Sequence, residues 1–139
     1  MLMSKRTVTI EWGDCDPADI VYFPNYFRWF DASTAHHFAA AGLPKPELIR
    51  RYDVVGFPML TTKSNYFVPS RHGDVVEIET RITRFGRSSF DVEHRLMRGD
   101  VLAVEGFETR ALVKRTAEGK LTSCRVPDEV KDLFGAPDT

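Results

Sequence analysis

The feature of this 139-residue chain that most constrains its fold is one long helical segment that is apolar on two sides. The segment covers residues 24–41 and begins with Pro24, whose missing N–H is tolerated in a first helical turn. Gly42 and Pro44 follow it, as is typical of a helix C-terminus. The two apolar stripes hold Phe27, Phe30, Thr34, Phe38 and Ala41, and Tyr26, Trp29, Ser33 and Ala40. A helix apolar on two sides buries most of its surface, so the rest of the chain is expected to cover it.

Most of the remaining chain is predicted to form β-strands. Strand-like patterns cover residues 5–12, 55–68, 75–83, 88–97 and 101–116, and short helices are expected at 45–52 and 126–134. Turns are expected at Arg98-Gly99-Asp100 and at Glu118-Gly119. An antiparallel meander of four or five strands can wrap one helix and bury it. The pattern therefore predicts an α+β fold, formed as a single domain over residues 1–139.

Composition excludes several classes of protein. The formal net charge of -1 argues against an electrostatic nucleic-acid binder, and no apolar run approaches the ~20 residues that span a bilayer. The first residues contain no apolar stretch of signal-peptide length, so we expect a cytoplasmic protein that binds neither nucleic acid nor a membrane. The two cysteines, Cys15 and Cys124, are too far apart to indicate a disulfide framework or a zinc site and are expected to be free thiols.

The segment GDCDPADIVYFPN at residues 13–25 is the strongest candidate for chemistry. Asp14 and Asp16 lie in a loop that leads into a helix N-terminus, where free backbone N–H groups can hold a developing oxyanion. A carboxylate facing that helix end can attack a carbonyl or activate water, so the layout fits acyl transfer. The same residues also fit a structural role, in which Asp14, Asp16 and Asp19 shape a turn and cap backbone groups.

A family resemblance rests on this loop and the helix after it. Residues 11–33, EWGDCDPADIVYFPNYFRWFDAS, closely resemble the active-site loop and central helix of the 4-hydroxybenzoyl-CoA thioesterases, and more broadly of the hotdog-fold acyl-CoA thioesterases. Segments that fit the family layout in the same order are GLP at 42–44, the run 56–68, GDVVEIET at 73–80 and SSFDVEH at 88–94. The resemblance covers nearly the whole chain, and GDCDPA followed by IV and FPNY is a specific motif.

The resemblance implies a fold, a reaction and an assembly. The fold would be a hotdog, an antiparallel β-sheet wrapped around one long central helix. The reaction would be hydrolysis of an aromatic or short acyl-CoA thioester, without a cofactor. Asp16 matches the catalytic aspartate, acting as the nucleophile or as the base for a water molecule, and the helix N-terminal N–H near Phe23 would polarise the carbonyl. The chain would form a homodimer or homotetramer with active sites at the subunit interface.

The resemblance also implies substrate-binding residues. Asp31 resembles an aspartate that contacts the far end of an aromatic acyl group, although it could instead pair with Arg28 on the same helix. Arg87 lies in a turn that is basic in the family and contacts the CoA nucleotide, and Arg84 and Arg71 are weaker candidates for the same role. Here a neighbouring basic position has become Gly86, which suggests a thinner phosphate clamp. The alternative for all three arginines is an ordinary solvated surface position.

Another departure concerns Asp19, which stands where the family commonly has Gly. Asp visits the left-handed backbone region more readily than most residues, although less freely than Gly. The substitution therefore bears on the details of substrate binding more than on the type of reaction.

Competing roles and functions are weaker. Cys15 lacks a neighbouring base that would make it a nucleophile. Adjacent His36 and His37 point about 100° apart on a helix, and the spacing of the four histidines predicts no metal site. A hotdog hydratase or dehydratase would pair an acidic residue with a histidine in one loop, but no histidine occurs between residues 13 and 35. A non-catalytic acyl-CoA-binding module would not need Asp16.

Overall fold

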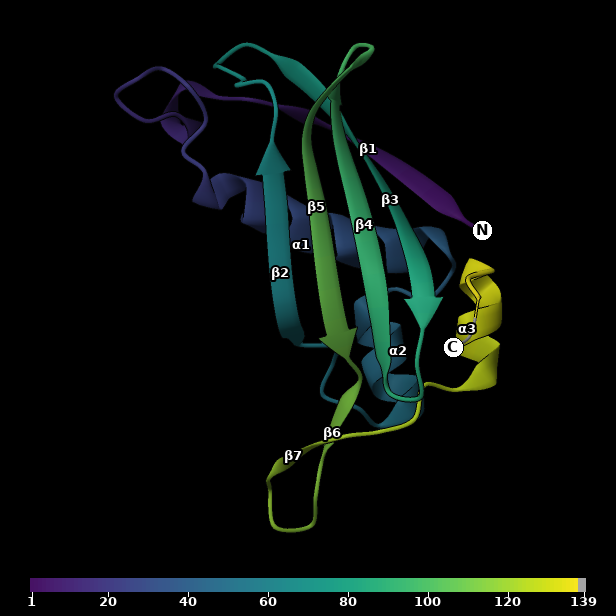
Figure 1. The fold of residues 1–139 in the computed structure, drawn as a ribbon. Coiled ribbons are helices and arrows are strands. Elements are labelled where there is room, and N and C mark those ends of the chain that lie inside the picture. Colours follow the sequence, from purple (N-terminus) through teal and green to yellow (C-terminus); the bar gives the residue numbers. More distant parts are fainter. Residues whose placement is uncertain (138–139) are drawn as a thin grey trace.

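The computed structural model describes residues 1–137, and its centre is a five-stranded antiparallel sheet (Figure 1). The strands are β1 (Met3–Thr9), β2 (Met59–Tyr66), β3 (Val75–Phe85), β4 (Ser89–Arg98) and β5 (Val101–Ala111), in the order β1-β3-β4-β5-β2. A separate hairpin contains β6 (Val113–Arg115) and β7 (Leu121–Ser123). The helices are α1 (Pro24–Ala40), α2 (Lys45–Tyr52) and α3 (Asp128–Phe134), and a short 3₁₀ turn, η1, covers Trp12–Asp14.

The predicted helices and strands are confirmed, but the order of the strands differs from a simple meander. Only β3, β4 and β5 follow one another across the sheet, whereas β2 pairs with β5 and forms the edge farthest from β1. The connection from β2 to β3, residues 67–74, contains Pro69 and is longer than a hairpin turn. It carries the chain from the β2 edge of the sheet to the position next to β1, near the other edge. As a result β2 is left with one unpaired edge within the chain.

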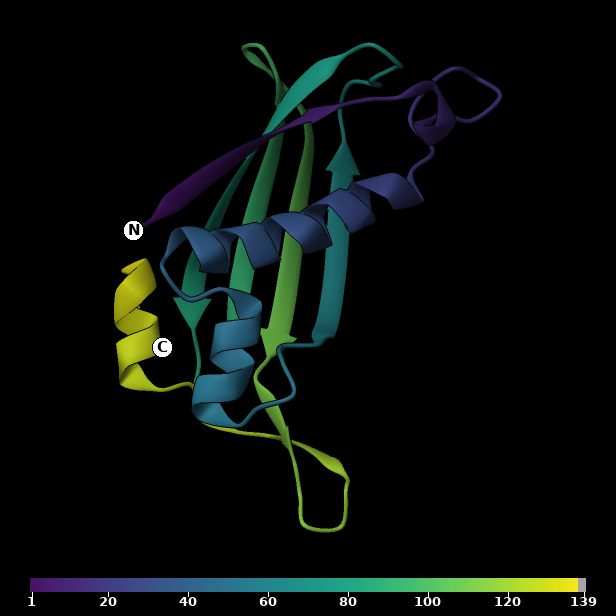
Figure 2. The same cartoon turned by 180° about the vertical axis from the view of Figure 1, so that it is seen from behind.

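Helix α1 crosses one face of the sheet from β2 towards β3 and β1 (Figure 2). Its buried side chains are Tyr26, Trp29, Phe30, Ser33, Thr34, His37 and Phe38. The residues of both predicted apolar stripes are buried or half-buried except Ala40, whereas the opposite side of the helix, which includes Arg28, Ala32 and His36, is exposed. One chain can cover only one face of α1, since the sheet lies on one side of it and does not enclose it.

A glycine allows α1 to approach the sheet closely. A Cβ atom at Gly106 on β5 would lie 2.5 Å from the ring of Phe30, a distance that real Cβ contacts essentially never show. Glycine therefore leaves the space that the Phe30 ring occupies. Phe30 also stacks on His94 of β4, with ring centroids 4.8 Å apart. Among residues 1–137, no helix is long and apolar enough to cross a membrane.

His37 is a buried titratable group near the C-terminal end of α1. Its side chain is fully buried, and its Nδ1 atom lies 2.6 Å from the hydroxyl oxygen of Ser4. Within the described chain its Nε2 atom has no hydrogen-bond partner. Burial, with smaller effects from His94 and His36, lowers the pKa of His37 from 6.5 to about 4.

We expect His37 to make the fold less stable as the pH falls from 6.5 to about 4. In this window the unfolded chain binds a proton at His37 and the folded chain does not, so acid favours unfolding. The stability is fully present above pH 6.5, and its loss reaches at most about 3 kcal/mol near the folded-state pKa. Urea unfolding across this window should show a weaker pH dependence for His37→Gln than for the wild type. The exposed neighbour supplies the control, His36→Gln, which should behave like the wild type; an unchanged slope in His37→Gln would contradict the prediction.

Candidate active site

Asp14 anchors the loop between β1 and α1. Its Oδ2 atom accepts a hydrogen bond from the Glu11 N–H at 2.9 Å, and its Oδ1 atom lies 3.3 Å from an Arg28 nitrogen. Its carbonyl oxygen accepts hydrogen bonds from the Tyr22 N–H at 2.9 Å and from the Asn25 side chain at 2.8 Å. Asp14 therefore has the structural role of shaping the turn, because its polar groups connect the loop to the first turns of α1.

Asp16 lies in a tight turn and keeps much of its carboxylate free. Its backbone N–H donates to the Ile20 carbonyl and its carbonyl accepts from the Asp19 N–H, each at 2.9 Å. Its Oδ1 atom accepts from the Ala18 N–H at 2.8 Å, and no other residue of the described chain contacts the carboxylate. The half-buried side chain faces a hollow of about 270 Å³ lined by Trp12, Gly13, Cys15, Asp16 and Pro17. Asp16 thus combines a fixed backbone with an available carboxylate oxygen.

The start of α1 offers an unused backbone donor. Phe23 is the N-cap residue and Pro24, which has no N–H, follows it. Within residues 1–137, no acceptor meets the Phe23 N–H. A free N–H at a helix N-terminus carries a partial positive charge that favours a developing oxyanion.

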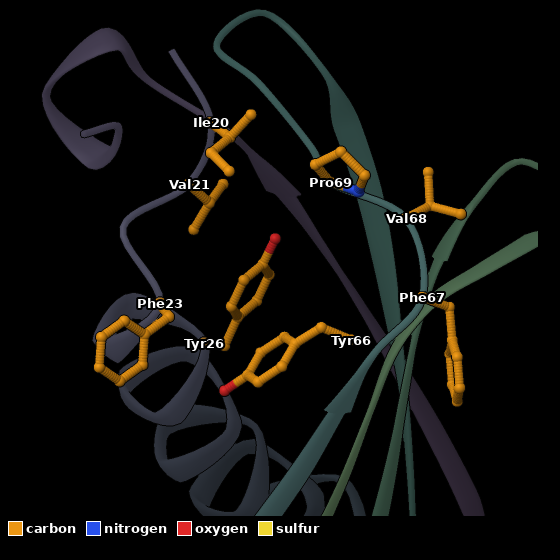
Figure 3. Close-up of a pocket in the computed structure, with 8 residues that line it drawn as sticks. All are labelled: Ile20, Val21, Phe23, Tyr26, Tyr66, Phe67, Val68 and Pro69. Atoms are coloured by element: carbon orange, nitrogen blue, oxygen red, sulfur yellow. The ribbon is translucent and has the colours of Figure 1, made fainter. Parts of the chain in front are cut away.

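A mostly apolar cavity of about 350 Å³ opens beside this donor (Figure 3). It is lined by Ile20, Val21, Phe23, Tyr26, Tyr66, Phe67, Val68 and Pro69. The rings of Tyr26 and Tyr66 lie 5.5 Å apart, and the Tyr66 hydroxyl points towards the beginning of α1. Asp16 does not line this cavity, so a single chain places the carboxylate and the donor at neighbouring hollows and not at a shared one.

A second loop, residues 67–74, lies against the Asp16 loop. The Val21 N–H donates to the Ser70 carbonyl at 2.9 Å, and His72 Nδ1 lies 3.0 Å from Asp19 Oδ1. Asp19 has φ 61, in the left-handed region that Asp visits more readily than most residues. Arg71 is exposed and lies in the same loop as His72, so it is at this end of the molecule. Sequence spacing did not reveal the histidine beside Asp19, because the two residues come from different loops.

Cys15 is a poor nucleophile in this setting. Burial raises the pKa of its thiol, the backbone of His72 lowers it, and the charges of Asp19, Asp14 and Asp16 raise it further. The net upward shift keeps the sulfur protonated, as expected from the sequence. Cys124 is also a free cysteine. No group of three or more His, Cys, Asp or Glu side chains within residues 1–137 is arranged to hold a metal ion.

Asp31 is paired, but not with Arg28. Its Oδ1 atom accepts a hydrogen bond from an Arg110 Nη2 atom at 2.7 Å, while Arg28 contacts Asp14. Arg110 lies on β5, seventy-nine residues away in sequence, and its side chain is only 4% exposed, whereas that of Asp31 is 67% exposed. The alternative of an Asp31–Arg28 pair on the helix is therefore wrong, because Arg28 turns towards the loop.

A buried polar network holds Arg110 in place. Arg110 Nε donates to Glu108 Oε1 at 2.8 Å, and Glu108 Oε1 also accepts the Thr34 hydroxyl at 2.7 Å. His94 Nε2 lies 3.2 Å from Glu108 Oε2, and His94 Nδ1 lies 2.8 Å from the Thr80 hydroxyl. Burial raises the pKa of Glu108, but the contacts with His94 and Arg110 outweigh it and lower the pKa to about 2. Glu108 is therefore an ionised acceptor at the centre of the network.

The alternation of residues along β5 could have predicted this network. Val104, Gly106, Glu108 and Arg110 alternate along β5 and share the face that contacts α1. Two charged residues at core-facing positions of a strand indicate a buried pair, because isolated charges are not buried.

The other two arginines that were predicted to bind CoA, Arg84 and Arg87, lie at the other end of the sheet. Arg84 Nε donates to Asp91 Oδ2 at 2.8 Å on β4, so its charge is largely matched. Arg87 is exposed in the turn between β3 and β4, and its carbonyl oxygen accepts the Val126 N–H at 2.8 Å, which places Arg125 beside it. This turn lies at the opposite end of the sheet from the loop that holds Asp16 (Figure 1).

Comparisons with known proteins agree with these features. A model of the thioesterase-like superfamily matches residues 10–134. The 4-hydroxybenzoyl-CoA thioesterase of Pseudomonas sp. (strain CBS-3) is 37% identical over 131 residues, which cover 89% of this chain and 92% of that relative. An aspartate-to-asparagine variant of 4-hydroxybenzoyl-CoA thioesterase, complexed with 4-hydroxybenzoyl-CoA, has a TM-score of 0.88 at 30% identity and coverages of 96% and 99%. A gentisyl-coenzyme A thioesterase has a TM-score of 0.81 at 28% identity, with coverages of 94% and 98%.

Proposed function

Because this chain belongs to the thioesterase-like superfamily and is a thioester hydrolase with the hotdog fold, we propose that it hydrolyses an aroyl-CoA whose ring carries a hydroxyl group. The relatives named for their substrates act on 4-hydroxybenzoyl-CoA and gentisyl-CoA, both of which are hydroxylated aromatic thioesters. The observation that carries the proposal is the available carboxylate of Asp16, in the loop that leads to the free N–H at the start of α1. A short acyl-CoA is the alternative substrate.

The proposed reaction consumes one water molecule and yields a carboxylic acid and CoA. The Phe23 N–H donates a hydrogen bond to the thioester oxygen as negative charge develops on it. Asp16 then acts in one of two ways. It either takes a proton from the water that attacks the carbonyl carbon, or attacks that carbon itself to form a mixed anhydride that water cleaves. In both routes the C–S bond breaks, and the CoA sulfur leaves as a thiolate that gains a proton.

The proposed site needs a second copy of the chain. Strand β2 is eight residues long and presents an edge that no other strand of the described chain pairs, so its free backbone N–H and C=O groups favour pairing with another strand. Antiparallel pairing of two β2 strands about a twofold axis brings the end of one sheet that holds the β3–β4 turn beside the end of the other sheet that holds the Asp16 loop. Arg87 of the partner subunit would then approach the Asp16 end. A homodimer, alone or within a homotetramer, thus places basic side chains near the CoA phosphates.

The arginines differ in their suitability for CoA. Arg71 lies at the Asp16 end of its own chain, and Arg87 would be delivered by the second subunit. Arg84 is the weakest candidate, because Asp91 already holds its guanidinium. Arg125 was not identified from the sequence. It precedes Val126, whose N–H contacts Arg87, but its guanidinium already pairs with Asp128 at 3.0 Å, so it is also a weak candidate.

Thiol release from a panel of acyl-CoAs tests the proposed function. The panel contains 4-hydroxybenzoyl, phenylacetyl, acetyl and palmitoyl thioesters, and free CoA is measured with a thiol reagent. We expect fastest release from 4-hydroxybenzoyl-CoA. If acyl-CoAs bind but none is cleaved, the chain is a binding module and the catalytic proposal is wrong.

The hydratase alternative has one observation in its favour, the contact between Asp19 and His72. Both side chains are about half exposed, and neither lines the cavity beside Phe23. Hydration of an enoyl-CoA would lower its ultraviolet absorbance, so incubation with this thioester separates the two reactions. We expect no change in absorbance.

A further inference from the structure

The start of α1 offers only one backbone donor to an oxyanion. Pro24 has no N–H, and within the described chain the Phe23 N–H meets no acceptor. The Asn25 N–H donates to the Tyr22 carbonyl at 2.9 Å. The Tyr26 N–H donates to the Phe23 carbonyl at 3.1 Å. A helix start usually leaves four N–H groups free, whereas this one leaves the N–H of Phe23 alone.

One donor does not satisfy an oxyanion in the cavity beside Phe23. When the thioester carbonyl is attacked, its oxygen gains a negative charge and can accept more than one hydrogen bond. The side chains that line the cavity are mostly apolar, and a charge that lacks hydrogen bonds is costly in such surroundings. Oxyanion holes of acyl-transfer enzymes combine backbone N–H groups with side-chain donors such as tyrosine. A second donor is therefore expected among the side chains of the cavity.

Among the residues that line the cavity, only Tyr26 and Tyr66 carry a side-chain donor. The Tyr26 hydroxyl points away from the helix, between Val21 and Pro69 (Figure 3). Burial raises the pKa of Tyr26, and contacts with the side chain and backbone of Ser70 offset part of this rise. The hydroxyl of Tyr26 is thus already directed at Ser70, which leaves Tyr66.

The Tyr66 hydroxyl is open and faces the right element. It points towards the beginning of α1 (Figure 3), and within residues 1–137 it has no hydrogen-bond partner. The backbone of Tyr66 pairs with Val104 at the end of β2, and its ring lies against that of Tyr26, so the position of the ring is fixed from two sides. Tyr66 is 47% exposed, so water can solvate its hydroxyl until a substrate covers it.

We propose that the Tyr66 hydroxyl is a further catalytic group, which donates a hydrogen bond to the thioester oxygen beside the one from the Phe23 N–H. This inference rests on the proposed function, since it concerns the same reaction. The hydroxyl keeps its proton, so the balance of atoms and charge in the reaction is unchanged. Both hydrogen bonds become stronger as negative charge grows on the oxygen. An interaction that is stronger in the transition state than in the bound substrate raises kcat.

The test is Tyr66→Phe, which removes the hydroxyl and keeps the ring against Tyr26. We expect kcat and kcat/KM for 4-hydroxybenzoyl-CoA to fall together by about ten- to a hundredfold, the range for one hydrogen bond to a charged group. KM should stay the same, because the interaction is made mainly in the transition state. Initial rates of thiol release at several substrate concentrations give the two constants.

The matched control is Tyr22→Phe. Tyr22 precedes Phe23, is exposed and does not line the cavity, so the loss of its hydroxyl should leave kcat at the wild-type value. Benzoyl-CoA provides a second comparison, because it has the same thioester oxygen but no hydroxyl group on its ring. Tyr66→Phe should slow the cleavage of both thioesters by the same factor if its hydroxyl acts on the thioester oxygen.

The outcomes separate this inference from the proposed function. If the wild type cleaves no acyl-CoA, the proposed function is wrong and the inference falls with it. If the wild type is active and Tyr66→Phe keeps its kcat, only the inference is wrong. A change confined to KM would show that Tyr66 only shapes the cavity, and a loss confined to 4-hydroxybenzoyl-CoA would show that it contacts the ring hydroxyl. Either result, or an equal loss in Tyr22→Phe, would also overturn the inference.

Discussion

Asp16→Asn is expected to lower kcat for 4-hydroxybenzoyl-CoA at least about 100-fold, with little change in KM. The substitution keeps the size of the side chain and its hydrogen bond from the Ala18 N–H, but the amide is neither a base nor a nucleophile. A loss of two to four orders of magnitude is typical when a general acid or base is removed. Initial rates of thiol release, measured at several substrate concentrations, give kcat and KM separately.

The matched control is Asp19→Asn, three residues along the same loop. Asn tolerates the left-handed conformation of residue 19, so this variant removes a nearby negative charge without disturbing the turn. We expect a change in kcat of less than about tenfold, since Asp19 is exposed and bound to His72. Equal losses in the two variants would mean that loop charge, and not a reacting carboxylate, supports activity, and the assignment of Asp16 would then be wrong.

At low substrate concentration, mixed dimers are expected to be more active than either parent variant. Arg87→Glu should raise KM for aroyl-CoA about tenfold, because it replaces a phosphate-binding charge with a repulsive one. Asp16→Asn should abolish turnover. If the partner subunit supplies Arg87 to the site that contains Asp16, each heterodimer has one site with both native residues. By random pairing about a quarter of all sites are then native.

The experiment coexpresses the two variants with different affinity tags and purifies the heterodimer. Rates are measured at a substrate concentration well below the KM of Arg87→Glu. The control pairs a wild-type chain with a chain that carries both substitutions, which cannot form a native site in this arrangement. A first heterodimer that is about tenfold more active than the control supports the shared site, because the control keeps Asp16 only beside the substituted residue 87. A more active control would show that Arg87 serves its own chain, and equal rates would show that Arg87 does not contact CoA.

The secondary structure could be predicted from the sequence because local signals determine it. Pro24 and Gly42 mark the ends of α1 within two residues, and the expected helix at 45–52 matches α2. The order of the strands could not be predicted in the same way. Alternation shows that β2 is a strand but not which strand it joins, and the connection at 67–74 takes it to the far edge.

The site was predicted less completely than the fold. The roles of Asp16 and Phe23 come from a resemblance in one continuous segment, which sequence displays directly. Arg110 and His72 were missed because they meet Asp31 and Asp19 only after the chain has folded, across seventy-nine and fifty-three residues. Spacing rules apply within one helix or loop, and they led to Arg28 as the partner of Asp31 when the actual partner lies on β5.

The contacts of Asp14 have a consequence for how substrate preference changes in such enzymes. Asp14 joins the loop to Tyr22, Asn25 and Arg28, so the segment from the loop to the first turns of α1 is tied together by its own residues. The Asp16 carboxylate and the Phe23 N–H proposed for bond cleavage therefore form a self-contained module. Substitutions on β2 and β5, apart from Tyr66, can remodel the surface that receives the acyl group while this module stays as it is, so a new specificity does not require the chemistry to be rebuilt.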